Sequence, residues 1–332
     1  MALRNSLKIL VLIIGVIIVG YYYLRGSYKI NNWTTRELEI RAVSVKPPLK
    51  LKFNIEDFLS NEPNVSSKYP GGFLRSPECP AEELEILILV FSAPGNFERR
   101  QAIRENWAQD LNNSSSLFFI LGGVEVKERD REKLEFEQDV ILANFTDSYR
   151  NLTLKTVALL NWAGQNCEFS FLLKCDDDMY INYPKLRHKL FEENAVFDNK
   201  TIIGRLAAGW RPNRSKKSKY YLSETEFPPQ VLPDFMSGPS YVITAGLVEP
   251  LLSAVLEEHW LTLEDVLVTG IVAKYRLGAT LVGWTAFHND RVALTTCNAK
   301  QLISIHDLKP REQKLVLVAR NKEIKRRCKI VP

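Results

Sequence analysis

The chain has 332 residues, of which 45% are hydrophobic, and a formal net charge of +5, so it can bury a sizeable core in one large domain or two small ones. Its basic residues cluster at 214–219 and 322–329, but neither cluster accompanies a nucleic-acid-binding motif, and we expect no nucleic-acid partner. The five cysteines include no CxxC pair, which argues against a zinc site of the usual spacing. In an oxidising compartment they could form up to two disulfides, whose connectivity the sequence leaves open.

An apolar run near the amino terminus, Ile9 to Leu24, predicts a membrane anchor. It is slightly shorter than the roughly 20 residues that usually span a bilayer, but the tyrosines at 21–23 suit a membrane interface and thin secretory-pathway bilayers tolerate shorter spans. A cleaved signal peptide is the alternative. Because no convincing small-x-small cleavage site follows, we predict an uncleaved transmembrane signal anchor over residues 9–24, after a cytoplasmic tail of residues 1–8.

Glycosylation sequons favour a luminal location for the chain beyond this anchor. Asn-x-Ser/Thr triplets without a central proline begin at Asn32, Asn64, Asn112, Asn113, Asn144, Asn151, Asn199 and Asn213. With a short tail before the anchor, they predict a single-pass type II topology. Residues 25–80 show no sustained period and recurrent proline and serine, so we predict a luminal stem there.

The first element of the predicted globular part is a buried strand over Leu84–Phe91, an almost continuous apolar run. A tight turn follows, and Asn96 can cap the next helix. In that helix Arg100 and Arg104 are one turn apart and share a face. A strand, a tight turn and a basic helix make a plausible seat for a nucleotide diphosphate. The alternative is that both arginines are ordinary solvated helix positions.

The next segments alternate between strand and helix patterns. We predict strands over 117–121 and 140–142, a charged helix over 127–138 and an amphipathic helix over 152–166. This alternation predicts an α/β fold with a largely parallel sheet.

The strand after the amphipathic helix, Phe169 to Leu173, leads to three consecutive carboxylates, Asp176, Asp177 and Asp178. Packing three like charges costs free energy unless a positive charge lies among them, and Mg²⁺ or Mn²⁺ prefers oxygen ligands. In α/β sheets ligands bind beyond the carboxyl ends of the strands. The alternative is an acidic turn on a solvated surface. An EF-hand loop is disfavoured, because Ile181 stands where that loop requires glycine.

The pattern changes after residue 201. Residues 210–233 are basic, aromatic and proline-rich, as expected of loops that form the substrate side of a site. A helix capped by Asn182 comes before this change. After it we predict a strand over 241–244, a helix over 246–258, a helix from 263 to about 276 and a strand over 281–284. Thr262 and Asp265 have the spacing of a capping box, which is a purely structural role for this aspartate. His288 and His306 follow in loops, where a lone histidine usually has a structural hydrogen bond.

Six segments, in order, resemble those of the Golgi β1,3-glycosyltransferases, a family that includes β1,3-galactosyltransferases, β1,3-N-acetylglucosaminyltransferases and, more distantly, the Fringe enzymes. The segments are FERRQAIRENW, NLTLKTVALLNW, FLLKCDDDMYIN, SGPSYVIT, LEDVLVTG and SIHDLKP. The resemblance covers the chain from about Leu84 to its last helix. It implies a GT-A type fold, with a Rossmann-like mixed sheet flanked by helices, in a catalytic domain over residues 81–332.

The resemblance also implies the residue roles. Asp178 looks like the direct ligand of a Mn²⁺ ion, with His306 as a second ligand and His288 as the runner-up. Asp176 and Asp177 would contact the ribose and sugar of a UDP-sugar donor or orient the site. Asp265 looks like the catalytic base. Arg100 and Arg104 fall where the family binds nucleotide.

The resemblance implies an inverting, Mn²⁺-dependent transferase of the Golgi membrane, with its catalytic domain in the lumen. We expect transfer of galactose from UDP-galactose to the 3-hydroxyl of an acceptor sugar. The alternative donor is UDP-N-acetylglucosamine, and a non-enzymatic, lectin-like luminal protein is the alternative of a different class. Partners would be the UDP-sugar, a glycan acceptor and the membrane, with homo- or hetero-oligomers of Golgi transferases as a further option.

Overall fold

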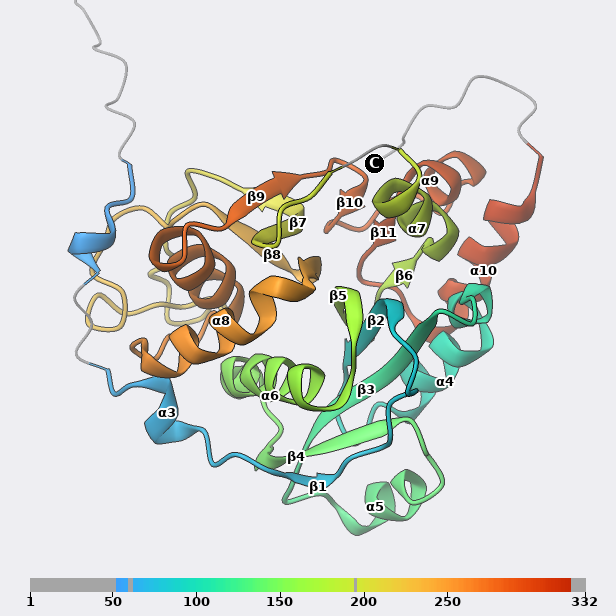
Figure 1. Ribbon diagram of the computed structural model, residues 1–332, viewed down its shortest axis with the longest axis horizontal. Helices are drawn as coiled ribbons and strands as arrows, with labels where there is room; N and C mark the ends of the chain where they lie inside the picture. The colour runs from blue at the N-terminus through green and yellow to red at the C-terminus, as the bar shows by residue number, and fades with distance from the viewer. Residues whose placement is uncertain (1–51, 59–61, 194–195, 324–332) are drawn as a thin grey trace, which may run out of the picture. The chain divides into compact units, whose positions relative to one another are not determined.

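The computed structural model describes residues 52–58, 62–193 and 196–323 of the chain (Figure 1). The chain divides into two compact units, residues 1–50 and 51–332, and all described residues belong to the second. The predicted tail, the anchor at 9–24 and the first part of the stem therefore lie outside the described residues. Within the described ranges, no helix is both long and apolar enough to cross a membrane.

A mixed eight-stranded sheet forms the centre of this unit. Its strands, in spatial order, are β1 (Phe73–Arg75), β4 (Val140–Thr146), β3 (Ser115–Val124), β2 (Leu84–Phe91), β5 (Phe169–Asp176), β8 (Phe235–Thr244), β7 (Thr201–Ala207) and β9 (Thr280–Gly283). The four strands from β4 to β5 are parallel, as predicted. The strands beyond β5 are not all parallel to it, because β8 runs antiparallel to both β5 and β7. The α/β prediction is confirmed, as a mixed sheet.

Helices cover both faces of the sheet (Figure 1). The helical segments are η1 (Ile55–Asp57), α3 (Val65–Lys68), α4 (Phe97–Glu105), η2 (Trp107–Asp110), α5 (Glu128–Leu134), η3 (Tyr149–Asn151), α6 (Leu152–Asn166), α7 (Tyr183–Phe191), α8 (Ala245–Glu257), η4 (Val266–Arg276), α9 (Thr296–Gln301) and α10 (Pro310–Asn321). One hydrophobic cluster joins the sheet to α6, α8 and η4, and a second joins it to α4, α7 and α10.

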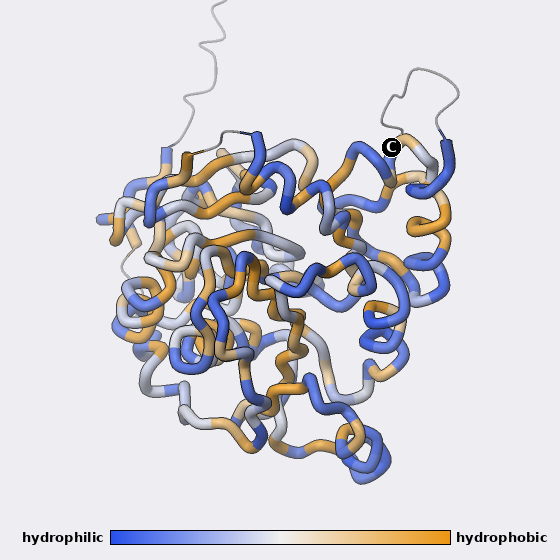
Figure 2. Tube along the Cα trace, turned by 45° about the vertical axis from the view of Figure 1, so that its right-hand side comes forward, coloured by the Kyte–Doolittle hydropathy of each residue, from blue (hydrophilic) through white to orange (hydrophobic). Residues whose placement is uncertain are grey.

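The apolar run of β2 follows from its place between these two clusters. Leu87 and Leu89 belong to one cluster, and Ile86 and Ile88 to the other, because successive side chains of a strand point to opposite faces. A strand buried on both faces has no solvated side to make polar. In Figure 2 the central strands are mainly orange, whereas the peripheral α5 at the bottom is largely blue.

Several boundaries agree with the sequence predictions and three features do not. The strand β2 and the helix α6 have the predicted bounds, and Asn182 caps α7 by accepting a hydrogen bond from the Lys185 backbone N–H. Asn96 stands at the start of α4 but makes no side-chain cap. The predicted helix after residue 263 is mainly a π-helix, η4, and no capping box forms at its start.

Part of the stretch predicted as a stem packs onto the sheet. The strand β1 pairs antiparallel with β4 at the sheet edge, and the side chains of Phe58 and Val65 are buried in the core. A disulfide between Cys79 and Cys167 ties this stretch to the end of α6. Cys175 is a buried free thiol. The packed region therefore extends closer to the amino terminus than residue 80.

Candidate active site

The strand β5 delivers the three aspartates to the edge of the sheet. It lies between the parallel β2 and the antiparallel β8, and its residues from Phe171 to Cys175 are buried. Asp176 is its last residue, so Asp177 and Asp178 follow directly in the turn before β6 (Tyr180–Ile181). The acids thus stand beyond the carboxyl end of a central strand, where α/β proteins bind ligands.

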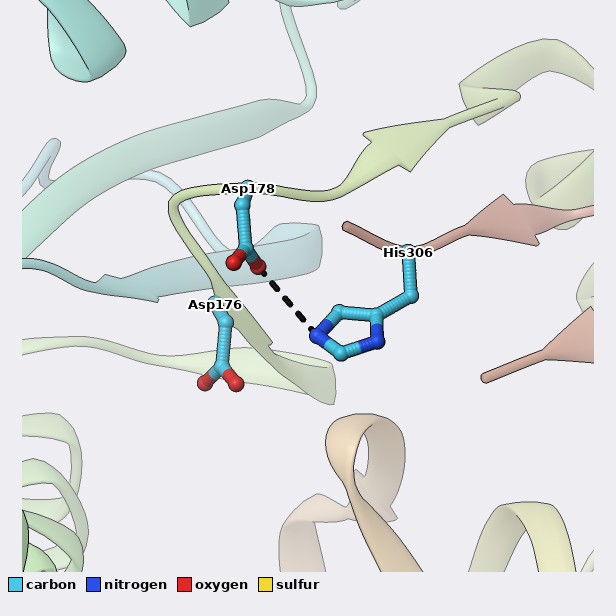
Figure 3. A group of neighbouring side chains, drawn as sticks. All are labelled: Asp176, Asp178 and His306. Carbon is cyan, nitrogen blue, oxygen red and sulfur yellow. Dashed lines mark ion pairs between the residues drawn. The ribbon is translucent and has the colours of Figure 1, made fainter. Parts of the chain in front are cut away.

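A second, three-stranded sheet brings a histidine from far along the chain to these acids. In it β11 (Ser304–Ile305) lies between β6 and β10 (Phe287–His288), and Ile305 pairs with Tyr180. This antiparallel register places His306, the next residue, beside the aspartate turn. The side chains of Asp176, Asp178 and His306 face a common space (Figure 3), and one potential ligand atom from each lies within 4.8 Å of the others.

The donor set of these three residues fits a hard divalent cation. Asp178 Oδ1 is buried, has no hydrogen-bond partner among the described residues and lies 3.5 Å from His306 Nε2. Burial and the neighbouring Asp176 raise the pKa of Asp178, so a cation at this point would relieve an unfavourable charge. His306 Nδ1 lies 2.8 Å from the carbonyl oxygen of Asn289, which can only accept, so Nδ1 carries the proton. In the neutral ring Nε2 then carries a lone pair that can bind a metal. In known metal sites a hydrogen bond from the other ring nitrogen orients a histidine ligand in this way.

The middle aspartate of the three is used differently. Asp177 is buried and accepts hydrogen bonds from Ser92 Oγ at 2.6 Å and Asn96 Nδ2 at 2.9 Å. Arg99 bridges Asp177 and Asp178 through one Nη1 atom, at 2.9 and 3.1 Å. Asp177 therefore fixes the aspartate turn to the β2–α4 turn, and both of its oxygens are engaged.

The structure pairs the two predicted nucleotide-binding arginines with acids other than the three aspartates, although Arg100 also donates to the Ser92 hydroxyl that binds Asp177. Arg100 has no exposed surface and forms a two-pronged ion pair with Glu137, and it also donates to the Ala93 carbonyl. Arg104 pairs with Glu137 and Asp139, both at 2.7 Å. These charges are already neutralised inside the fold. The arginine of α4 that reaches the acids is Arg99, which the pairing of positions 100 and 104 led us to miss.

The fourth predicted acid, Asp265, lies in the helical turn that leads into η4. Its Oδ2 accepts a hydrogen bond from the Gly238 N–H and its Oδ1 from the Val266 N–H, both at 2.9 Å. Each oxygen keeps a free lone pair. Loss of hydration and the charge of the adjacent Glu264 raise the pKa of Asp265 to about 7. A carboxyl group with such a pKa is suited to accepting a proton near neutral pH.

One cavity of about 430 Å³ connects these groups. Asp176, Asp265 and His306 all contribute to its lining, and Asp178 lies beside it. The remaining wall includes partly exposed aromatic side chains from the loop after β7 and from η3, which are Tyr149, Trp210 and Tyr220. A cavity of this size that combines aromatic walls with a few convergent polar groups is typical of a small-molecule site. His288 is not part of the acidic group; its Nδ1 lies 3.1 Å from the Asp290 carbonyl oxygen.

Fold and site together define an α/β protein with an acid-lined ligand cavity at the carboxyl end of its central strands. Residues 98–279 match the family model described as Galactosyltransferase. Because this match covers more than half of the chain, the chain belongs to the galactosyltransferase family of hexosyltransferases. The family resemblance drawn from the six sequence segments is thereby confirmed.

Several proteins that are similar in sequence to this chain are named beta-1,3-galactosyltransferases. Beta-1,3-galactosyltransferase 2 of Mus musculus is 31% identical over 250 residues, which are 72% of this chain and 59% of the relative. The Homo sapiens protein of the same name is 32% identical over 251 residues, with the same two shares. Beta-1,3-galactosyltransferase 1 of Mus musculus is 29% identical over 264 residues, 77% of this chain and 76% of the relative. The chain thus spans less than two thirds of the length of the first two relatives.

Proposed function

We propose that this chain is an inverting, Mn²⁺-dependent galactosyltransferase with a GT-A type fold. It would move galactose from UDP-galactose to the 3-hydroxyl of an acceptor sugar, making a β1,3 linkage on glycoproteins, glycolipids or proteoglycans. The observation that carries the proposal is that Asp176 and His306, on one side, and Asp265, on the other, line a single cavity. The names of the relatives support galactose as the sugar that is transferred.

The metal side of the site would bind the donor. Asp178 and His306, with Asp176, would hold the cation, whose charge stabilises the leaving diphosphate when it is bound. Asp176 lies on the cavity wall and would also reach the ribose or the sugar. Asp177 would orient the aspartate turn through Ser92 and Asn96. Arg100 and Arg104 would not contact the nucleotide, because Arg100 pairs with Glu137 and Arg104 with Glu137 and Asp139.

Asp265 would carry the acid–base step. The acceptor's 3-hydroxyl is a poor nucleophile at neutral pH, so a positioned carboxylate must take its proton as it attacks the anomeric carbon. The new C–O bond forms as the bond from that carbon to the UDP oxygen breaks, and UDP leaves with the bonding electron pair. Attack from the face opposite UDP converts an α-linked donor into a β-linked product. Gly238 and Val266 fix the Asp265 carboxylate from behind and leave its outer lone pairs for the hydroxyl.

We further propose that the chain is a single-pass type II protein of the Golgi membrane, anchored by residues 9–24. The sequons and the Cys79–Cys167 disulfide support a luminal, oxidising location. This chain would form homo-oligomers, or hetero-oligomers with other Golgi transferases, which would place several transferase activities together on one membrane.

The test is a donor screen. The soluble part of the chain, residues 51–332, is incubated with Mn²⁺, a panel of sugar acceptors and UDP-galactose, UDP-N-acetylglucosamine or UDP-N-acetylgalactosamine, and the linkage of any product is determined. We expect a β1,3-linked galactose product, and no product after chelation of the metal. Product from UDP-N-acetylglucosamine alone would establish the alternative donor. Binding of glycans with no turnover of any UDP-sugar would favour the lectin-like alternative.

A further inference from the structure

A buried lysine connects the two sides of the cavity. Lys174 precedes Asp176 by two residues on β5, so both side chains emerge on the same face of the sheet. Only 2% of its side chain is exposed. Its Nζ atom lies 2.8 Å from Asp176 Oδ1, 2.5 Å from the Gly238 carbonyl oxygen and 3.4 Å from Glu264 Oε1. One ammonium group therefore contacts β5, β8 and the helical turn that carries the proposed base.

Both groups that Lys174 contacts on the far side hold Asp265 directly. Gly238 accepts a hydrogen bond from Lys174 through its carbonyl oxygen and donates one to Asp265 Oδ2 through its N–H. Glu264 is the residue before Asp265, and its second carboxylate oxygen accepts hydrogen bonds from Thr156 Oγ1 and the Tyr241 hydroxyl, at 3.0 and 3.1 Å. Two immediate neighbours of Asp265, Gly238 and Glu264, are thus both in contact with Lys174.

The space around Gly238 shows how closely this arrangement is packed. A Cβ atom on Gly238 would come within 3.2 Å of Asp265 Oδ2 and 3.4 Å of Glu264 Oε1. The first of these contacts would be tighter than ordinary van der Waals contact and the second would be at its limit, so the backbone of β8 lies directly against the two acids. A shift of Gly238 would move the Asp265 carboxylate with it.

We propose that Lys174 is a positioning residue for the transfer reaction, which holds Gly238 and Glu264 so that the Asp265 carboxylate faces the acceptor at a fixed place relative to Asp176. This inference rests on the proposed role of Asp265 as the base. A buried lysine costs free energy unless its charge is paired and its protons are hydrogen-bonded. Here Lys174 donates hydrogen bonds to Asp176 and Gly238 and forms a second ion pair with Glu264. Lys174 contacts both Asp176, on the proposed donor side of the cavity, and the neighbours of Asp265, on the proposed acceptor side. A purely structural ion pair would not connect the two sides.

Lys174 also sets the electrostatic surroundings of the base. The titratable groups that interact electrostatically with Asp265 are Glu264 from its own turn, Lys174 from β5, Tyr241 from β8 and Tyr149 from η3, and Asp176 lines the same cavity. Glu264 and burial raise the pKa of Asp265, whereas Lys174 and the two backbone N–H groups lower it. Removing the lysine charge should therefore raise the pKa of Asp265 further.

The chain offers a matched control in a second buried lysine. Lys155 on α6 is 3% exposed, pairs with Asp147 at 2.8 Å and donates to the Ser92 carbonyl oxygen at 2.6 Å. It has the same kind of partners, one carboxylate and one carbonyl, but contacts neither Gly238 nor Glu264 in the described structure. Loss of Lys155 tests what removal of a buried ion pair does by itself.

The experiment compares Lys174→Met with Lys155→Met in the soluble part of the chain, with Mn²⁺, UDP-galactose and the acceptor found by the donor screen. For Lys174→Met we expect kcat per folded molecule to fall roughly 10- to 100-fold, as expected for a displaced reacting group, while UDP with Mn²⁺ still binds by calorimetry. The rising limb of kcat against pH should move to higher pH. Lys155→Met should lower stability but leave this limb in place. An unmoved limb and a near-wild-type kcat in Lys174→Met would overturn the inference.

A double variant covers the case in which Lys174→Met does not fold. Lys174→Met with Glu264→Gln removes the lysine together with the carboxylate that would be left unpaired. We expect its pH limb to return toward that of the wild type, because the two charges shift the Asp265 pKa in opposite directions, while kcat stays low because Gly238 is no longer held. A near-wild-type kcat in the double variant would overturn the positioning role. If the wild-type chain transfers no sugar from any donor, the proposed function fails instead, which is a different result.

Discussion

Two charged regions of this molecule stand next to each other and differ in how their charges are used. In α4, Arg100 and Arg104 are paired with Glu137 and Asp139 inside the fold. At the end of β5, Asp178 retains a buried oxygen without a hydrogen-bond partner in the described part of the chain. Charges that the fold neutralises contribute to stability, whereas charges left beside a cavity are available to a ligand. Substitutions in the two regions should therefore change different measurements.

The largest effect is expected for Asp265→Asn on the cavity side. The amide keeps the shape of the side chain but cannot accept the acceptor's proton, so kcat should fall by about 10² to 10⁴. Rapid-quench single-turnover assays would measure the loss, and calorimetry should show unchanged binding of UDP with Mn²⁺. Near-normal turnover in this variant would remove Asp265 from the role of base.

On the α4 side, Arg100→Met should affect folding rather than the reaction. Removing Arg100 leaves the buried Glu137 with only the partly exposed Arg104 as its ion-pair partner. An uncompensated buried charge typically costs about 3–5 kcal/mol in the free energy of unfolding, and we expect a loss toward the lower end of that range. Urea unfolding measures that change, and UDP affinity and kcat per folded molecule should remain as in the wild type. If UDP affinity fell while stability was retained, Arg100 would bind nucleotide directly.

The Asp178→Ala variant should give the opposite result to Arg100→Met. Loss of a metal ligand should weaken Mn²⁺-dependent UDP binding by at least about 100-fold, since even residues that only orient ligands cost 10- to 100-fold. Thermal stability should change little, because the removed carboxylate has a raised pKa in the fold. Calorimetry with and without Mn²⁺ makes the measurement. Identical Mn²⁺ dependence in variant and wild type would overturn the metal assignment.

The pH dependence of the cavity side follows from Asp265. Its pKa is about 7 in the folded chain and about 3.9 in an unfolded one, so folding favours the protonated form. The contribution of this group to stability is full below about pH 4 and is lost as the pH rises through 7. Activity should change in the opposite direction, rising with pH through about 7 because the base must be ionised. Asp265→Asn should flatten this part of the stability profile, and a wild-type activity profile without a limb near 7 would contradict the assignment.

The smallest effect is expected for Arg104→Met. Arg104 and Asp139 are both partly exposed, and Glu137 keeps its two-pronged ion pair with the buried Arg100 when Arg104 is removed. Ion pairs near the surface contribute only about 0–1 kcal/mol, so we expect a loss of that size. Urea unfolding should show a change well below that of Arg100→Met, and transfer should be unaffected. An equally large loss of stability in both variants would mean that the two arginines act as one buried unit.

The sequence was sufficient for those parts of the fold in which local pattern and tertiary environment agree. The uninterrupted apolar run of β2 is compatible with a buried strand, and the helical period of α6 is compatible with a helix. Both elements have the predicted bounds. The direction of β8 was not readable, because an antiparallel strand buried on both faces has the same apolar pattern as a parallel one. The same holds for η4, whose composition does not distinguish a π-helix from an α-helix.

The site divides in a similar way. The run of three aspartates is visible in the sequence, but their separate surroundings depend on partners from other elements. Asp177 is engaged by the β2–α4 turn, and Asp178 meets His306 only because β11 pairs with β6. Lys174 was overlooked, although a charged residue inside an apolar strand is a signal that a search for buried charges would have found. Arg99 was missed because helical spacing does not tell which of two adjacent arginines faces a neighbour.

By itself, the sequence determined several elements, such as β2 and α6, that acids end a buried strand, and to which family the chain belongs, because these follow from local patterns and from residue order. Only the tertiary structure decided which charges neutralise each other and which remain for a ligand. Lys174, Gly238 and Glu264 are far apart along the chain. The hydrogen bond from Lys174 to Gly238 and its ion pair with Glu264 depend on distances that the packing of β5, β8 and the turn before η4 creates. Burial then fixes the outcome, because a charge removed from water must find a partner in the fold or in a ligand.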